Sequence, residues 1–341
     1  MATDTRPLSI IQVGSGFWGR TWAEVAQRAP GCSLAAVVDG AAAARQWAAA
    51  ALGVPTFATL PAALGEVSAE AVLVVSPPAS HRSLTEEALD AGLHVVCEKP
   101  LALDVEDAEA IAAAAAQARL HVVVSQNYRL RRQPKALQQL ISDGVLGRLL
   151  GIRIACRRDL RDSFISRGDW RASMAHPYLV DMAIHHIDLL RMVTGLEVTQ
   201  AVATAWRVPD SPFLSEPNVE AILTLSDGTP VAYEGTFAAV GRETSWNGDW
   251  EIVGTRARAT WTGGVGNPLR GNVVLDEYGS PPHRVELPRL PALDRLGILR
   301  ALRQAVRHGV TPESTAADNV QSMRAVLALA RSIDEGAPVA P

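Results

Sequence analysis

The sequence predicts an α/β protein in which a doubly wound parallel sheet is followed by an α+β domain with a mainly antiparallel sheet. The length of 341 residues suits about two domains. The first half alternates short β-rich runs with alanine-rich helical stretches, the pattern of crossover helices that cover both faces of a parallel sheet. After about Asn127, longer alternating segments follow. We therefore expect one domain over residues 1–126 and a second over residues 127–341.

The expected strands of the first domain are nearly continuous apolar runs, because strands buried on both faces need no polar alternation. For two of the helices between them, the sequence predicts the residue that caps the N-terminus. Ser80 is placed to cap a helix that stops at Gly92. Asp104, together with Asp107, is placed to cap a helix that runs to Arg119. The expected strands are residues 8–13, 34–39, 71–75, 93–97 and 121–125.

The second domain is expected to combine longer strands with two helices. Asp227 and Gly228 tolerate the positive φ of a tight turn, so they predict a hairpin. One helix, over residues 178–194, interrupts the strands, and another follows them over residues 316–335. The expected strands are residues 149–157, 198–207, 219–225, 231–237 and 250–252.

Composition excludes several classes of protein. Hydrophobic residues make up 48% and charged residues 20% of the chain, which is ordinary globular usage. A formal net charge of -4 gives no attraction to nucleic acid or anionic lipid. We expect no membrane span, because no apolar run reaches about 18 residues, and no secretory signal. Cys32, Cys97 and Cys156 are too far apart for a disulfide framework or a zinc site, so we expect a cytoplasmic protein without a metal.

The sequence Gly14-Ser-Gly16-Phe-Trp-Gly19 directly follows the first expected strand and opens the first helix. In this context the glycines let the backbone approach a pyrophosphate at a helix N-terminus. Asp39 ends the second expected strand, 20 residues after Gly19, where an acidic side chain accepts hydrogen bonds from a ribose diol. The alternative is a glycine turn with a capping aspartate. The context favours dinucleotide binding.

Glu98-Lys99-Pro100 follows the strand over residues 93–97. Open α/β sheets place their ligands at the carboxyl ends of the strands, so Lys99 is positioned to act on a ligand. The alternative is a solvated lysine at a strand end. Pro100 favours the functional interpretation, because it stiffens the turn and a cis peptide bond there would aim the preceding side chain.

The expected helix over residues 178–194 is apolar around most of its circumference, which predicts burial. Asp181, His185 and Asp188 nevertheless fall on one stripe at helical spacing. Buried polar groups without partners cost about 1 to 3 kcal/mol each, so they need partners or a function. The alternatives are a self-satisfied structural network and, less favoured, a metal site that lacks an evident fourth ligand. His186 points elsewhere and is expected to be structural.

Together these motifs resemble the Gfo/Idh/MocA oxidoreductases, the family of glucose-fructose oxidoreductase and inositol dehydrogenase. The resemblance covers nearly the whole chain. It implies a nicotinamide cofactor in an N-terminal Rossmann domain and a polyhydroxylated substrate against an open-faced C-terminal sheet. It also implies homodimers or homotetramers through that sheet. The matching elements are Gly14 to Gly19, Asp39, Ser76 to His81, Glu98 to Pro100, Gln126 to Arg129, Gly144 to Gly147, and Asp181 with His185.

The resemblance also implies roles for individual residues. Lys99 would hydrogen-bond the reacting oxygen, and Glu98 would lie beside the nicotinamide ribose. Asp181 and His185 match the acid and histidine of the substrate helix, with His185 as general base. The chain departs from the family where a glycine-rich stretch usually precedes this helix and where Ala183 replaces a glycine. The implied cofactor contacts are Gly14, Gly16, Phe17, Trp18, Gly19, Asp39, Ser76, Pro77, His81, Glu98, Lys99 and Gln126, and the substrate contacts are Tyr128, Arg129 and Tyr178.

We therefore predict an NAD-dependent oxidoreductase that transfers hydride between the nicotinamide and a carbinol carbon of a sugar, sugar acid or cyclitol. Histidine suits the base, because its reference pKa of about 6.5 lies near working pH. NAD is expected rather than NADP, because Asp39 would repel a 2'-phosphate and Gly40 offers no cation. Arg45 is expected to lie too far into the next helix to replace it.

The sequence is also compatible with three alternative functions. The oxidation could be transient and enable elimination or hydrolysis of a glycoside, with tightly held NAD regenerated in each turnover. The chain could instead be a non-catalytic regulator that binds NAD. A metal-dependent sugar isomerase or hydrolase is the most distant alternative.

Residues 148–171 contain seven arginines and three acids. Arginine pairs bidentately with carboxylates and phosphates, so one hypothesis is an anionic substrate, with Arg161, Arg167 and Arg171 as the candidate contacts. The alternative is that these arginines line the sheet face or a subunit interface. Strand alternation places Arg153 and Arg157 on one face, with Arg158 on the other.

Overall fold

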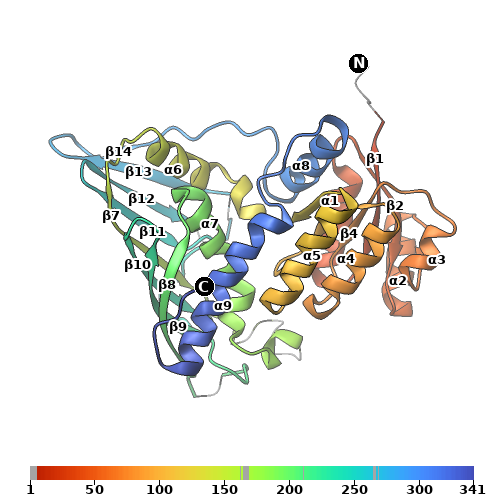
Figure 1. The fold of residues 1–341 in the computed structure, drawn as a ribbon, viewed down its shortest axis with the longest axis horizontal. Helices are drawn as coiled ribbons and strands as arrows, with labels where there is room; N and C mark the ends of the chain where they lie inside the picture. Colours follow the sequence, from red (N-terminus) through yellow and green to blue (C-terminus); the bar gives the residue numbers. More distant parts are fainter. Residues whose placement is uncertain (1–5, 162, 164–168, 210, 264–265, 268) are drawn as a thin grey trace. The chain divides into compact units, whose positions relative to one another are not determined.

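The computed structural model describes residues 6–161, 163, 169–209, 211–263, 266–267 and 269–341. Its contacts divide the chain into two compact units (Figure 1). The first contains the chain up to Leu130 together with Pro291–Met323, and the second contains Arg131–Leu290 with Arg324–Pro341. The second expected domain thus contributes a segment to the first unit.

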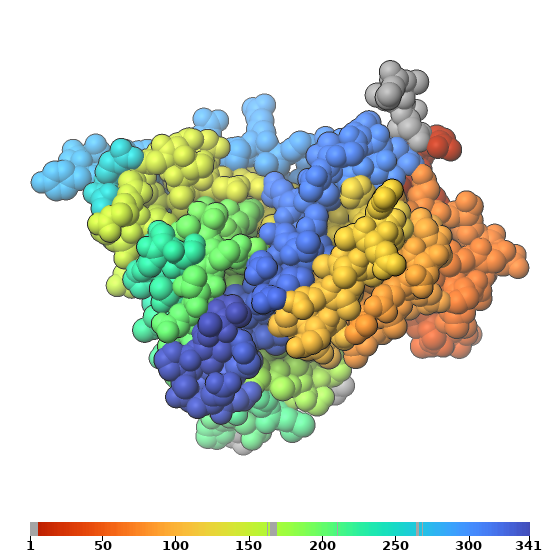
Figure 2. Space-filling view, viewed as in Figure 1, coloured from red at the N-terminus to blue at the C-terminus, as the bar shows by residue number. Residues whose placement is uncertain are grey.

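The first unit is built on a parallel sheet of six strands in the order β3-β2-β1-β4-β5-β6. This is the strand order of a Rossmann fold, in which ligands bind where the order reverses, at β1 and β4. Helices α4 and α5 lie over the near face of this sheet in the ribbon view (Figure 1), and their atoms form the surface seen there in the space-filling view (Figure 2). All four residues of β4 are fully buried. The strands are β1 (Leu8–Val13), β2 (Cys32–Val38), β3 (Thr56–Phe57), β4 (Ala71–Val74), β5 (His94–Cys97) and β6 (Val122–Val124). The helices between them are α1 (Phe17–Arg28), α2 (Ala42–Leu52), α3 (Leu60–Leu64), α4 (His81–Asp90) and α5 (Val105–Ala118).

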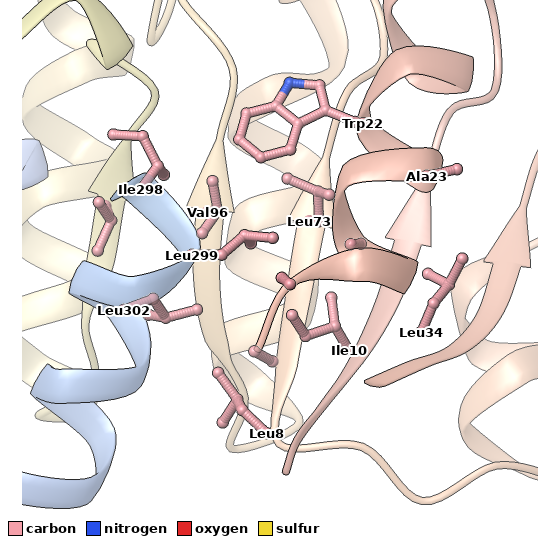
Figure 3. Close-up of a cluster of buried hydrophobic side chains, with 14 of the residues drawn as sticks. Leu8, Ile10, Trp22, Ala23, Leu34, Leu73, Val96, Ile298, Leu299 and Leu302 are labelled. Carbon is pink, nitrogen blue, oxygen red and sulfur yellow. The ribbon is translucent and has the colours of Figure 1, made fainter. Parts of the chain in front are cut away.

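Helix α8 (Asp294–His308) completes the core of this unit from far along the sequence. Ile298, Leu299 and Leu302 are almost fully buried, in one apolar cluster with Leu8 of β1 and Trp22 of α1 (Figure 3). Burying large aliphatic side chains contributes about 1.5 to 3 kcal/mol each. The helix therefore belongs with the parallel sheet and not with the strands that precede it in sequence.

The second unit contains an eight-stranded sheet in the order β14-β13-β12-β11-β7-β10-β9-β8. Only the pairing of β7 with β10 is parallel among its described strands. Helices α6 (Arg132–Ser142) and α7 (Ile184–Thr194) lie against one face (Figure 1). The boundary between the units falls within α9 (Ala316–Glu335). The strands are β7 (Leu149–Arg157), β8 (Val198–Trp206), β9 (Asn218–Leu225), β10 (Pro230–Thr236), β11 (Asp249–Gly254), β12 (Ala257–Gly263), β13 (Gly271–Glu277) and β14 (His283–Arg284).

The fold class predicted from the sequence is confirmed, and β1, β7 and α9 have the predicted bounds. The hairpin is also confirmed, with Gly228 at φ 86° between β9 and β10. Asp104 caps α5 by accepting a 2.7 Å hydrogen bond from the Asp107 amide. The capping prediction for Ser80 was wrong, because its hydroxyl bonds the Pro77 carbonyl and its side chain caps no amide of α4.

Among the described residues, none of the helices is both long and apolar enough to cross a membrane.

Candidate cofactor and catalytic sites

The glycine-rich loop has a different steric reason for each of its glycines. Gly14 has φ +96°, and a Cβ there would lie 2.5 Å from the Val75 carbonyl oxygen. A Cβ on Gly19 would lie 2.4 Å from the carbonyl oxygen of Gly14, where α1 packs against the loop. At Gly16 no atom lies within 4 Å of the added Cβ. Two glycines thus shape the loop, and the third leaves open space beside it.

Gln12 stabilises this loop through hydrogen bonds. The sequence analysis did not identify this residue. Its side chain is fully buried in β1, and its Nε2 donates to the carbonyl oxygens of Gly14 at 2.8 Å and Gly19 at 2.7 Å. A polar residue within an otherwise apolar strand was the available signal. The bonds join both ends of the loop to the strand that precedes it.

The loop and the start of α1 fit the pyrophosphate of a dinucleotide. No side chain caps the helix at Gly16, and its first turn carries no acid. The first amides of a helix lack partners within it, and its dipole favours an anion. The open space at Gly16 is where a backbone must be bare for a pyrophosphate to approach. Phe17 and Trp18 flank this position with 61% and 38% exposure.

Asp39 lies just after β2, beside the glycine loop. Its Oδ2 accepts hydrogen bonds from the Ser15 amide at 2.8 Å and the Ser15 hydroxyl at 2.9 Å, and Oδ1 accepts one from the Ala41 amide at 2.9 Å. The prediction that Arg45 lies too far into the next helix to reach the position after Asp39 was wrong. One guanidinium nitrogen of Arg45 donates to the carbonyl oxygens of Asp39 at 2.7 Å and Gly40 at 2.8 Å.

The turn after β5 contains a cis peptide bond between Lys99 and Pro100. Three donors engage the carboxylate of Glu98. Its Oε1 accepts from Trp22 Nε1 at 2.6 Å and from the Ser125 hydroxyl at 3.1 Å, and its Oε2 accepts from the Lys99 amide at 3.0 Å. Through these hydrogen bonds Glu98 links the turn to α1 and to the end of β6. Trp22 is a second residue of this region that the sequence analysis missed.

His81 supports the same turn from the other side. It is fully buried, with Nδ1 2.9 Å from the Pro100 carbonyl oxygen and Nε2 2.9 Å from that of Ser76. Burial lowers the pKa of His81. Both ring nitrogens thus face the backbone and support the turn. The expected cofactor contact of His81 stays a prediction. Ser76 itself bonds the Ser80 hydroxyl at 2.7 Å, and the Pro77 carbonyl accepts from the Ser80 amide at 3.0 Å.

Arg129 is anchored inside the first unit. It is 4% exposed, pairs with Asp318 at 2.6 Å and donates to the Glu313 carbonyl oxygen at 2.6 Å. These bonds join the segment after β6 to the start of α9. The expected substrate contact of Arg129 stays a prediction. Gln126 and Tyr128, its neighbours, are also buried.

In the second unit, the expected single α-helix over residues 178–194 is wrong in its first part. Leu179–Ala183 form a π-helical turn that leads directly into α7. Asp181 lies in the middle of this turn, and His185, which is 5% exposed, lies in the first turn of α7. π-helical turns are rare and occur frequently at functional sites. The 3.6-residue spacing used to place Asp181 on the stripe therefore does not hold there.

Asp181 forms an ion pair that the sequence analysis missed. Arg171 Nε lies 3.1 Å from Asp181 Oδ1, and a second guanidinium nitrogen lies 2.9 Å from Asp169 Oδ1. Burial disfavours the charge on Arg171, but Asp181 and Asp169 raise its pKa overall. Arg171 and Asp181 come from separate elements, so no local pattern could have shown the pair.

His186 and Tyr178 belong to the core between helix and sheet. His186 is fully buried, with Nδ1 2.8 Å from the Tyr233 hydroxyl and Nε2 3.0 Å from the Trp246 carbonyl oxygen. Burial lowers the pKa of His186 to about 4. The Tyr178 hydroxyl donates to the Cys156 carbonyl oxygen at 3.3 Å. These contacts agree with a structural role for His186. The expected substrate contact of Tyr178 stays a prediction.

Among the described residues, five arginines of the segment 148–171 pair with acids. Arg153 and Arg157 lie on the outer sheet face, with Arg153 2.8 Å from Glu251 and Arg157 2.9 Å from Glu234. Arg158 lies on the other face, over the Trp246 ring at 4.4 Å, and Arg161 pairs with Asp159 at 2.6 Å. Arg167 lies outside the described residues. The predicted alternation of Arg153 and Arg157 against Arg158 agrees with this placement.

Two family matches divide the chain much as the two units do. Residues 8–126 match the oxidoreductase family with an NAD-binding Rossmann fold, and residues 135–260 match the GFO/IDH/MocA C-terminal domain. These matches cover both the glycine loop and the helix that carries Asp181 and His185.

Relatives and solved structures agree with these matches. A D-apiose dehydrogenase of Paraburkholderia graminis is 28% identical over 228 residues, which are 67% of this chain and 60% of the relative. A myo-inositol dehydrogenase of Streptomyces leeuwenhoekii is 27% identical over 296 residues, 83% of this chain and 86% of the relative. The structure of an inositol dehydrogenase homolog from Azotobacter vinelandii, complexed with NADH and myo-inositol, has a TM-score of 0.83 at 20% identity and covers 98% of each chain. An aldose-aldose oxidoreductase from Caulobacter crescentus, complexed with glycerol, gives 0.86 at 22% identity, over 98% of this chain and 100% of the other.

Proposed function

The chain belongs to the Gfo/Idh/MocA family of NAD-binding oxidoreductases, and on this basis we propose that it oxidises or reduces a sugar or cyclitol at a carbinol carbon. The observation that carries the proposal is the loop built for a pyrophosphate, closed at Gly14 and Gly19 and open at Gly16. The substrate class is supported by the relatives named above, whose names refer to apiose and myo-inositol.

We assign the chemistry to three side chains. When bound, NAD supplies the acceptor for the hydride that leaves the carbinol carbon. His185 takes the hydroxyl proton as this carbon becomes a carbonyl, and returns it in the reverse direction. Lys99 hydrogen-bonds the reacting oxygen, and Asp181 supports the proton transfer as an anion. The position of Asp181 in a π-helical turn directly before α7 supports this assignment.

We further propose that the substrate is neutral. Arg161 and Arg171, two of the three arginines considered for an anionic substrate, each pair with an aspartate. A sugar acid would have to compete with carboxylates that already occupy these cations. A neutral polyol needs hydrogen bonds only.

The proposed reaction is tested with a panel of sugars, sugar acids and cyclitols, each offered with NAD and with NADP. The absorbance of the reduced cofactor measures turnover. A neutral polyol is expected to reduce NAD, and Lys99→Ala is expected to abolish that turnover. Product formation without net NADH would indicate the elimination or hydrolysis pathway. Tight NAD binding without turnover of any compound would contradict the proposal and favour a regulator.

The outer face of the second unit's sheet is the proposed subunit interface. Val202 of β8 and Ile222 of β9 line a groove on this face with 39% and 60% exposure. Exposed apolar patches of this kind mark association sites, and we propose that a second copy of the chain covers it. Ile222→Asp is expected to lower the mass measured by light scattering. Val310→Asp, at an exposed position in the first unit, is the matched control and is expected to leave the mass unchanged.

We also place the protein in the cytoplasm. Its three cysteines are free thiols, and burial raises the pKa of Cys156 to about 11. Reduced thiols are the rule in the cytosol, so this state supports the proposed compartment.

A further inference from the structure

We infer that Arg171 is a positioning residue for the proposed reaction, which acts by holding the carboxylate of Asp181 ionised and in a fixed orientation. The inference rests on the proposed catalytic role of Asp181. It replaces the expected function of Arg171 as a receptor for an anionic substrate.

Arg171 is held from several directions. Its side chain is 10% exposed, and its guanidinium lies over the Trp170 ring at 4.4 Å. Asp169 Oδ1 accepts both from the Arg171 backbone amide at 3.0 Å and from the guanidinium at 2.9 Å. A planar guanidinium fixed by a stacked ring and a bound carboxylate keeps its remaining donors in a defined direction.

One of those donors determines where Asp181 lies. Arg171 Nε donates to Asp181 Oδ1 at 3.1 Å, and the Asp181 side chain is itself only 16% exposed. Asp181 lies in the π-helical turn Leu179–Ala183, four residues before His185. Arg171 therefore ties the helical segment that presents both proposed catalytic groups to the turn Trp170–Ser173.

The charges favour this role over substrate binding. Asp169 and Asp181 contribute two negative charges against the single positive charge of Arg171. An anionic substrate at Arg171 would bring a third carboxylate to a cation that already has two. Without Arg171, the partly buried Asp181 would lose this ion pair, which favours its ionised form and fixes its orientation.

A double-mutant cycle on the full chain separates this role from a merely structural one. R171M, which removes the charge and keeps the aliphatic stem, is expected to lower kcat about 10- to 100-fold with little change in the Kd for NAD. In a D181N background R171M is expected to cause no further loss, because the group through which Arg171 acts is already neutral. R171K keeps the charge and is expected to recover part of kcat. If R171M does not fold, R171Q, which also removes the charge, takes its place in the cycle with D181N.

D169N is the matched control. It neutralises the other carboxylate partner of Arg171 but keeps an oxygen acceptor for the guanidinium and leaves the bond to Asp181, so kcat is expected to fall less than in R171M. Additive losses for R171M and D181N would overturn the inference alone. A rise in KM restricted to acidic substrates would restore Arg171 as a substrate contact. Unchanged kcat in D181N would overturn both the inference and the proposed role of Asp181.

Discussion

The glycine loop of the first unit and the acid–histidine helix of the second unit are built in different ways. The loop works through its backbone, and its residues lie close together in sequence from Gln12 to Gly19. The proposed site on the helix consists of side chains, and Asp181 pairs with Arg171, a residue of a different element. A backbone site is thus specified by residue type within a short segment, whereas a side-chain site depends on pairs that only the fold brings together.

The sharpest test of this comparison uses two neighbouring histidines of α7. His185→Gln is expected to lower kcat about 10²- to 10⁴-fold through loss of the general base. The Kd for NAD is expected to remain the same, because the glycine loop is intact. Steady-state kinetics and titration of NAD measure the two effects. Normal turnover in a folded His185→Gln variant would make His185 a core residue.

His186→Gln is the matched variant and is expected to change stability instead. Burial lowers the pKa of His186 to about 4, below the unfolded value of about 6.5. As the pH falls through this window the unfolded chain takes up a proton that the folded chain does not, so folding loses about 3 kcal/mol from this residue by pH 4. The His186→Gln variant has no histidine at this position, so its folding free energy is not expected to change with pH in this way.

Urea unfolding of both proteins from pH 7 to pH 4 measures the difference. The stability advantage of the unsubstituted protein over His186→Gln is expected to shrink steadily as the pH falls. Parallel pH dependences for the two proteins would show that His186 titrates normally in the folded state.

The same contrast explains what the sequence could predict. The glycine loop, Asp39 and five of the six strands of the parallel sheet depend on local residue types and on apolar runs, and the sequence predicted them. Helix α8 was not, because no side chain caps it at Leu293 and its first residue, Asp294, has φ +53°, so it lacks a start signal. Its place in the core of the first unit depends on contacts with strands almost 300 residues earlier in the chain.

Near the proposed catalytic residues, the sequence predictions were incomplete for another reason. The identities of Asp181 and His185 were readable, but a π-helical turn replaces the expected helical spacing at Asp181. Arg171 was interpreted from its charge alone, and its carboxylate partners decide what that charge does. Long side chains reach groups that sequence separation does not reveal, as Arg45 also shows.

Substitutions within the glycine loop test the backbone side of the comparison. Gly16→Ala is expected to fold normally, because no atom lies within 4 Å of its new Cβ, and to weaken NAD binding about tenfold or more, that is by at least 1.4 kcal/mol. Gly14→Ala is expected to destabilise the fold instead, because its Cβ would lie 2.5 Å from a carbonyl oxygen at φ +96°. Thermal unfolding and calorimetric titration of NAD separate the two. Unchanged NAD affinity in Gly16→Ala would remove the pyrophosphate from this position.

The smallest expected effect concerns Asp39 and Arg45, whose side chains are expected to affect the preference between NAD and NADP. Asp39 opposes a 2'-phosphate by its charge, whereas the Arg45 guanidinium already lies at the end of β2. Asp39→Asn keeps an acceptor for Ser15 and removes the charge, so it is expected to narrow the preference for NAD. Arg45→Ala in that background is then expected to weaken NADP binding by about twofold to fivefold, the range of a partly exposed ion pair. Arg28→Ala, at the far end of α1, is the control. Calorimetric Kd values for NAD and NADP decide the outcome, and equal NADP affinity with and without Arg45 would show that its bonds to the backbone are structural only.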